Sequence, residues 1–127
     1  MHTDTQGTNV VSLIRPRVSD CFTGAASGVR FYGLRATADA DPRRLVDAWL
    51  AYTADCSVRD LTWAESEEAE AQVQFSPDRP SRLARIAAFA RPERPGPPAG
   101  TWWVEASVVH ALAERIATRE ASRRAAA

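Results

Sequence analysis

His110 is the histidine best placed for chemistry in this sequence, and Glu114 follows it four positions later. On a helix, side chains four residues apart lie on the same face. A neighbouring carboxylate orients the imidazole and raises its basicity, which suits a general base near neutral pH. The pair predicts a proton-transfer site, in which Trp102 or Trp103 would exclude water. The alternative is a partly exposed helical histidine with an ordinary ion-pair partner.

The residue types give little support to metal or thiol chemistry. His110 and Glu114 supply only two ligands, and the other histidine, His2, lies in a polar N-terminal stretch. Cys21 follows an aspartate, whose charge disfavours the reactive thiolate, and Cys56 has no better neighbours. The spacing of the two cysteines matches neither a zinc site nor a disulfide framework. We expect no metal, no cofactor, and two reduced and mostly buried thiols.

Aromatic side chains form the second group of candidates. An uncovered sheet face with several aromatic residues would be too large an apolar patch for a monomer. A second copy, a terminal helix or a bound ligand has to cover it. The pattern therefore predicts either a homodimer or an enclosed pocket for a small molecule or peptide, and it does not separate the two. The aromatic set is Phe31, Tyr32, Trp49, Trp63, Trp102 and Trp103, of which Trp49 is expected in the core and Tyr32, Trp63, Trp102 and Trp103 at the ligand or interface.

Charge and composition restrict the partners and the compartment. The sixteen basic residues are all Arg and are balanced by sixteen acidic residues, so the net charge is zero. A neutral chain has no global field that draws it to nucleic acid or an anionic membrane. A stripe of Arg115, Arg119, Arg123 and Arg124 is interrupted by acidic residues and lacks interleaved aromatics, which indicates a solvated face. We expect no nucleic-acid partner.

The absence of Lys and the abundance of Ala are typical of a GC-rich bacterial coding sequence, as in actinobacteria. The alternative is selection for the bidentate anion contacts that Arg makes. The N-terminus lacks the basic and apolar regions of a signal peptide. No apolar run approaches the roughly 18 residues that a membrane span requires. We expect a soluble, cytoplasmic protein with no membrane partner.

The elements that must position these residues are predicted from periodicity and caps. Asp41 and Pro42 predict the start of a helix over 42–54. Strands are predicted over 9–15 and 29–38, with a loop over 19–28 between them. Residues 57–75 alternate in their second half and predict a hairpin, although the Ala- and Glu-rich stretch 64–72 also favours a helix.

The C-terminal half contains a proline-rich connector and the paired tryptophans. A helix is predicted over 81–91, and the prolines of 91–100 predict a stiff, extended connector. The weak helix propensity of residues 101–104 predicts a strand up to about 107, which places Trp102 and Trp103 on opposite faces. Ser107 offers a cap for a final helix from 108 to about 124.

Together these elements predict one α+β domain over 9–127, preceded by a disordered tail at 1–8. Their order indicates a ferredoxin-like βαββαβ sandwich with a short N-terminal strand and an extra C-terminal helix. Two functions fit. One is a homodimeric binding or accessory protein that uses an aromatic sheet face. The other is a small enzyme of the cyclase or isomerase type, independent of metals and nucleotides, with His110 as the base, Glu114 as its orienting residue and Tyr32 or a tryptophan lining the site.

Overall fold

The computed structural model describes residues 16–78, 82 and 98–126. The strand predicted over 9–15, the helix predicted over 81–91, the tail at 1–8 and most of the proline-rich connector lie outside the described residues. The account below concerns the described part of the chain.

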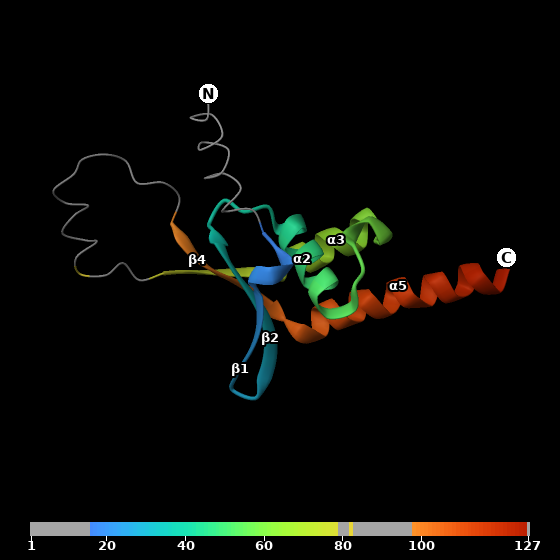
Figure 1. Ribbon diagram of the computed structural model, residues 1–127, viewed down its shortest axis with the longest axis horizontal. Coiled ribbons are helices and arrows are strands. Elements are labelled where there is room, and N and C mark those ends of the chain that lie inside the picture. The colour runs from blue at the N-terminus through green and yellow to red at the C-terminus, as the bar shows by residue number, and fades with distance from the viewer. Residues whose placement is uncertain (1–15, 79–81, 83–97, 127) are drawn as a thin grey trace, which may run out of the picture.

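The described chain forms a four-stranded antiparallel sheet with its helices on one face (Figure 1). The spatial order of the strands is β1-β2-β4-β3. The strands are β1 (Cys21–Ala26), β2 (Val29–Thr37), β3 (Gln74–Pro77) and β4 (Ala99–Glu105). The helices are α2 (Pro42–Ala54), α3 (Trp63–Glu70) and α5 (Ala106–Ala126), with the short 3₁₀ turns η1 (Val18–Asp20) and η2 (Val58–Asp60).

This arrangement confirms the predicted α+β class but not the ferredoxin-like order. In a ferredoxin-like sandwich a helix follows the first strand. Here β1 and β2 pair directly with each other as a hairpin, and β4 inserts between β2 and β3.

The hairpin includes a strand where the sequence predicted a loop over 19–28. Ser27 and Gly28 both have positive φ, 52° and 80°, which matches a tight turn between antiparallel strands. The small residues of β1 were wrongly interpreted as loop residues. A Cβ atom on Gly24 would lie 2.4 Å from the ring of Phe31, so this glycine leaves room for a cross-strand aromatic side chain.

Helix α3 replaces most of the hairpin predicted over 57–75, so that prediction was wrong and the helical alternative is confirmed. Thr62 Oγ1 accepts a hydrogen bond from the Glu65 backbone N–H at 3.2 Å, and the Glu65 carboxylate accepts one from the Thr62 N–H at 2.8 Å. This reciprocal capping box satisfies two free N–H groups at the start of the helix. The alternation of residues 69–75 therefore spans a helix end and only the beginning of β3.

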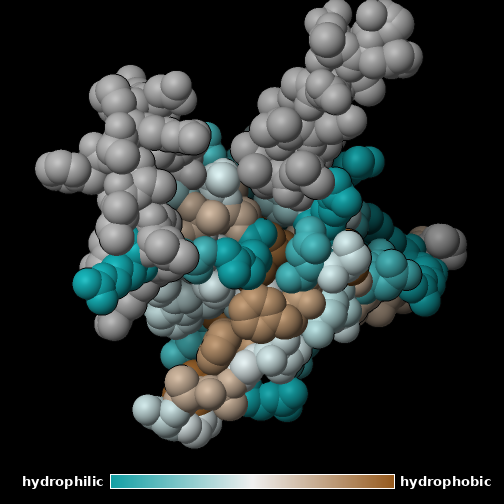
Figure 2. Space-filling view, turned by 60° about the vertical axis from the view of Figure 1, so that its left-hand side comes forward, coloured by the Kyte–Doolittle hydropathy of each residue, from teal (hydrophilic) through white to brown (hydrophobic). Residues whose placement is uncertain are grey.

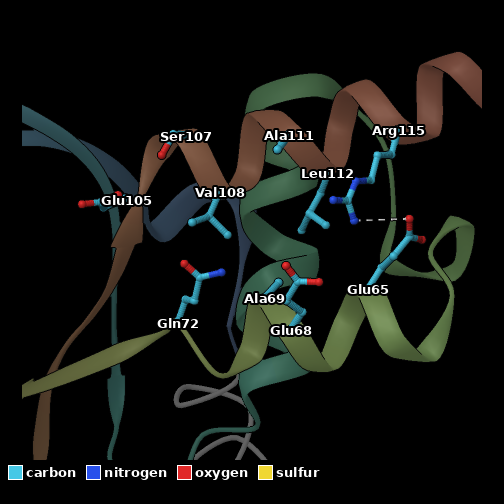
Figure 3. A pocket seen from close by; sticks show the side chains of 10 residues that line it. All are labelled: Glu65, Glu68, Ala69, Gln72, Glu105, Ser107, Val108, Ala111, Leu112 and Arg115. Atoms are coloured by element: carbon cyan, nitrogen blue, oxygen red, sulfur yellow. Dashed lines mark ion pairs between the residues drawn. The ribbon is translucent and has the colours of Figure 1, made fainter.

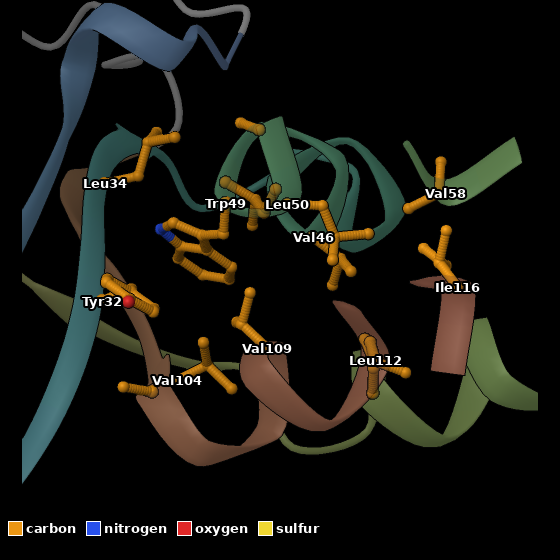
Figure 4. Packing of buried hydrophobic residues seen from close by; sticks show 14 of the residues in the cluster. Tyr32, Leu34, Val46, Trp49, Leu50, Val58, Val104, Val109, Leu112 and Ile116 are labelled. Atoms are coloured by element: carbon orange, nitrogen blue, oxygen red, sulfur yellow. The ribbon is translucent and has the colours of Figure 1, made fainter. Parts of the chain in front are cut away.

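The core lies between the sheet and helices α2 and α5. The α2 helix begins at the predicted cap, because the Asp41 carboxylate accepts from the Arg43 N–H at 3.0 Å. From α2, Trp49 points into the space between β2 and α5 (Figure 4) and is 0% exposed. Its indole N–H donates to the carbonyl oxygen of Gly33 at 3.2 Å. The other core residues are Tyr32, Leu34, Ala36, Leu45, Val46, Ala48, Leu50, Val58, Ala69, Val104, Ala106, Val109, Leu112 and Ile116.

The change from β4 to α5 occurs at Glu105–Ala106, within two residues of the predicted boundary. As predicted, Trp102 and Trp103 lie on opposite sides of β4. Trp102 packs against the core, together with the buried Val104. Trp103 lies on the face without helices. No helix among the described residues has both the length and the apolar character needed to cross a membrane.

Glu65 also joins α3 to α5. Its carboxylate pairs with the guanidinium of Arg119 and lies 3.7 Å from that of Arg115. Arg119 donates a further hydrogen bond to the backbone oxygen of Asp60 at 2.7 Å. The Arg119 hydrogen bond, followed by the bond from the Thr62 backbone N–H, lowers the pKa of Glu65 below its usual value.

Replacing this carboxylate tests the link between the two helices. We expect Glu65→Gln to lower the free energy of unfolding by about 1–2 kcal/mol at neutral pH, because an ionic hydrogen bond is lost. Since folding lowers the pKa of Glu65, this stabilisation is present above the unfolded-state pKa of about 4.3 and disappears as pH falls through the folded-state value. Urea unfolding from pH 7 to pH 3 measures it.

Glu67 provides the control, because it is exposed on the same helix and has no ion pair in the described structure. Glu67→Gln should change stability by less than about 0.5 kcal/mol. A Glu65→Gln deficit that stays the same at acid pH would contradict the ionic explanation.

Candidate functional site

The hydroxyl of Tyr32 is the centre of a polar cluster at the edge of the core. Tyr32 is 6% exposed, yet its Oη lies 2.8 Å from Thr53 Oγ1 and 2.6 Å from His110 Nε2. The three residues come from β2, the last turn of α2 and the second turn of α5. The cluster therefore forms only when both helices pack on the sheet.

Local structure explains why the phenol reaches this place. On β2, Tyr32 shares the helix-covered face with Leu34 and Ala36, since alternate residues of a strand lie on one face. Its ring is buried, and its hydroxyl reaches the border between α2 and α5. A buried hydroxyl without a partner would destabilise the fold, and Thr53 and His110 provide partners on two sides.

Two further side chains extend the cluster toward the surface. The rings of Tyr52 and His110 each meet Tyr32 edge to face, at centroid distances of 5.8 and 5.6 Å. The Tyr52 hydroxyl lies 3.2 Å from Thr23 Oγ1 on β1. The result is a patch of hydroxyl and imidazole groups around one buried phenol, with His110 on its exposed side.

The geometry places a proton between a phenol and an imidazole. When His110 is neutral with Nε2 unprotonated, Tyr32 donates to it, and Thr53 donates to Tyr32 Oη. When His110 is protonated, Nε2 donates to Tyr32 Oη, and Tyr32 donates to Thr53. Either arrangement satisfies each group, so the cluster accommodates both charge states of the histidine.

The structure brings together some of the predicted site residues and separates others. His110 and Tyr32 are in direct contact. No hydrogen bond or ion pair joins His110 to Glu114 in the described residues, because Nε2 of His110 is directed at Tyr32. Glu114 instead lines an open hollow along α5, near Arg115 and Arg119. The hydrogen bond that holds the His110 ring is therefore the one with Tyr32 rather than one with Glu114.

The tryptophans lie apart from this cluster. The indole N–H of Trp102 donates to Thr37 O at 2.9 Å, and its ring packs on Phe75 with a centroid distance of 4.9 Å. Trp63 lies on α3 rather than on the sheet and is 71% exposed. Trp102 or Trp103 was predicted to exclude water from His110, but the ring that meets His110 is that of Tyr32, and Trp103 lies on the opposite face of the sheet.

The helix-free face of the sheet is a second candidate site. Phe22, Phe31 and Trp103 lie on it; Phe22 is 37% exposed, and the rings of Phe31 and Trp103 meet edge to face at 6.2 Å. Trp103 Nε1 donates to Ser76 Oγ at 3.2 Å. Figure 2, with the sheet side of Figure 1 brought forward, shows an apolar band bordered by hydrophilic surface. No element of the described chain packs on this face.

Sequence reasoning found only part of each site. Thr53 and Tyr52 were missed because nothing in the sequence links them to Tyr32 or His110. Phe22 was missed because its segment was predicted as a loop. The sequence did contain a signal for this pairing, because Phe22 lies two positions before Gly24 and Phe31 lies two positions before Gly33. Aromatic side chains often cover glycines on neighbouring strands.

A hollow of about 270 Å³ lies between α3 and α5 (Figure 3). Ala69 and Leu112 form its floor, while Glu68 and the ion pair of Glu65 with Arg115 form its rim. The remaining lining residues are Gln72, Glu105, Ser107, Val108 and Ala111. Neither His110 nor any tryptophan lines this hollow, so it is not the enclosed histidine pocket that the enzyme hypothesis requires.

The two cysteines were expected to be mostly buried, and the structure places both in partly buried positions. Both are free. Burial, followed by the charge of Asp20, raises the pKa of Cys21 to about 11. Burial also raises the pKa of Cys56. Both thiols are therefore protonated at neutral pH.

Comparison with known proteins finds no family model that matches this chain, and no curated protein or solved structure with significant similarity to it.

Removing the central hydroxyl tests the polar cluster. We expect Tyr32→Phe to lower the free energy of unfolding by about 1–2 kcal/mol, because Thr53 and His110 lose their shared partner. Tyr52→Phe is the matched control; Tyr52 is 40% exposed, and water replaces its contact with Thr23, so its effect should stay below about 0.5 kcal/mol. Urea unfolding at neutral pH compares them. Equal losses of unfolding free energy in the two variants would show that the buried Tyr32 hydroxyl contributes no more to stability than the exposed Tyr52 hydroxyl.

Proposed function

We propose that this protein is a noncatalytic binding or accessory protein that acts as a homodimer, with the helix-free sheet face as its contact surface. The supporting observation is the aromatic set Phe22, Phe31 and Trp103 on a face that no described element covers. Val29, at 46% exposed, extends the apolar area along β2. Contiguous apolar surface of this kind is typical of interaction sites.

The flatness of the face suits a broad contact. A Cβ atom on Gly33 would lie 2.4 Å from the ring of Phe22, so the ring lies over the glycine rather than standing away from the sheet. Facing sheets pack about 10 Å apart with interdigitated side chains. A second copy, whose aromatic rings lie over its sheet in the same way, fits this spacing.

The charges on the face favour a second copy over an unrelated partner. In the register of β2 and β4, Trp103 lies opposite Gly33 in the middle of the face. Arg35 lies opposite Thr101 toward one end of the strands, and Glu105 lies opposite Phe31 toward the other end. A two-fold axis between the faces, running across the strands at the level of Trp103, would set each Arg35 opposite the other copy's Glu105. A symmetric dimer requires self-complementarity of this kind.

Arg35 is available for such a contact. Its ion pair with Asp78 is exposed, with 61% of the Arg35 side chain accessible, and exposed pairs contribute little stability. Glu105 has no ion pair in the described residues. The interface would combine an aromatic centre with charged pairs at its rim, as stable protein interfaces do.

Sedimentation equilibrium at micromolar concentration tests the dimer. We expect the natural chain to sediment as a dimer and Trp103→Glu to weaken the association at least about 100-fold, because a charge replaces a central aromatic anchor. Trp63→Glu is the matched control, since it makes the same change at an exposed tryptophan on α3, and it should leave the dimer intact. A natural chain that is strictly monomeric would refute the proposal.

Charge reversal identifies the face that is used. Arg35→Glu and Glu105→Arg alone should each weaken the dimer by roughly tenfold, and the double variant should recover most of the loss. A double variant that is weaker than both single variants would place the interface elsewhere.

A second function is favoured by the 2.6 Å contact between Tyr32 and His110. In this function the protein is a small proton-transfer enzyme of the cyclase or isomerase type, with His110 as the base and Tyr32 as the group that orients it. The exposed position of His110 gives a substrate access to the imidazole. Among the described residues, none of the hollows found is lined by His110, which makes this the weaker candidate, since such catalysis usually excludes water.

Native mass spectrometry of the protein isolated from its source would reveal a retained compound whose turnover can be followed. If His110 is the base, His110→Asn should lower that turnover by about 100-fold or more. Glu120→Gln, an exposed change farther along α5, should leave it unchanged. Undiminished turnover in His110→Asn would exclude His110 as the base.

A further inference from the structure

Three arginines line one hollow in the helix layer. The hollow has a volume of about 450 Å³ and lies between the start of α2 and η2. Arg43 and Arg44 come from the first turn of α2, and Arg59 comes from η2. The volume lies within the range of small-molecule sites.

Helix stability does not explain the two arginines on α2. The N-terminus of a helix carries a partial positive charge, so acidic residues are favoured in its first turn and basic residues are not. The first turn of α2 contains no acidic residue, while Arg43 and Arg44 occupy it. A bound anion would interact favourably with both the helix terminus and the arginines.

The neighbouring carboxylates are engaged in the fold. Asp41 caps α2 through the Arg43 backbone N–H at 3.0 Å. Asp47 accepts from Ser57 Oγ and from the Val58 N–H, both at 3.0 Å. Among the described residues, neither Arg44 nor Arg59 forms an ion pair. Three arginines outnumber Asp41 and Asp47 in the lining of the hollow, so one positive charge is in excess there, and the guanidinium groups of Arg44 and Arg59 are free of ion pairs with the described residues.

An aromatic platform adjoins the hollow through Arg43. The Arg43 guanidinium lies 4.5 Å from the ring centroid of Trp63 and donates to Ser66 Oγ at 3.3 Å. Ser66 is fully buried and donates to Glu70 at 2.7 Å, which fixes the position of Arg43. Trp63 is 71% exposed, so one face of its indole rests on a cation and the ring remains open to a planar ligand.

We infer that this hollow binds a small phosphate monoester that carries a planar ring, of the nucleoside monophosphate class. The phosphate lies at Arg44 and Arg59, whose guanidinium groups match phosphate oxygens in pairs. The ring stacks on Trp63, where aromatic contact gives affinity for any flat base. The site uses a local charge excess in a neutral chain and does not depend on dimerisation through the sheet face.

Calorimetric titration with adenosine monophosphate, adenosine and inorganic phosphate tests the inference. Adenosine monophosphate should bind, and each of the other two should bind at least roughly tenfold more weakly, because each lacks one half of the recognition. The double variant Arg44→Gln/Arg59→Gln should weaken binding of the monophosphate at least roughly tenfold. Arg30→Gln, an exposed arginine on β2, is the matched control and should bind as the natural chain does.

The tryptophan has its own test. Trp63→Ala should weaken the binding of adenosine monophosphate by roughly tenfold and leave the binding of inorganic phosphate unchanged. Trp103→Glu, which alters the sheet face, should retain full affinity, so failure of the dimer and failure of this site are distinguishable. Circular dichroism confirms that each variant is folded.

Three results would overturn the inference. One is no binding of adenosine monophosphate at millimolar concentration. Another is binding that the double variant or Trp63→Ala leaves unchanged. The third is tighter binding of single-stranded oligothymidine that the same variants abolish, which would assign the surface to single-stranded nucleic acid.

Discussion

The buried hydrogen bond from Trp49 to the carbonyl of Gly33 is the contact on which the rest of the arrangement depends. It ties α2 to β2 in the centre of the core, where an unpaired indole N–H or carbonyl would be costly. Once α2 is held there, Thr53 at its end lies beside Tyr32, and Arg43 at its start lies beside Trp63. Both polar sites of the helix layer are thus positioned by one helix.

The two-residue period of β2 separates the two candidate surfaces. Tyr32 belongs to the face that the helices cover, and Phe31 belongs to the face that they do not. The same period in β4 separates Trp102 from Trp103. A contact on the open face could therefore change without repacking the core, while changes at Tyr32 act on the contacts of both helices. The residues of the open face and those of the polar cluster therefore lie on opposite faces of the sheet although they are adjacent in sequence.

Local signals in the sequence predicted part of the fold. They failed where contacts between residues far apart in the sequence determine the structure. The Asp41–Pro42 start of α2, strand β2 and the boundary between β4 and α5 followed from caps and propensities. The loop predicted over 19–28 failed because a glycine is tolerated in a strand when an aromatic ring covers it, as the ring of Phe31 on β2 covers Gly24 on β1. The hairpin over 57–75 failed because the alternation was given more weight than the helix propensity of 64–72, and the Thr62–Glu65 capping box that begins α3 was missed. His110 and Tyr32 were predicted to belong to one site, but the direct contact between them depends on how two helices pack, which no local pattern encodes.

The ends of β3 and β4 have a consequence for how this protein can vary. Pro77 pairs with Gly100, and the Asp78 N–H donates to the carbonyl of Ala99 at 3.0 Å, so the chain leaves and re-enters the sheet at neighbouring positions. The entropic cost of closing a loop grows only slowly with its length. The pairing of β3 with β4 therefore fixes where the intervening chain begins and ends, at Asp78 and Ala99. The junction is a natural place for lineages to diversify this chain, or for an engineer to graft a foreign segment onto it.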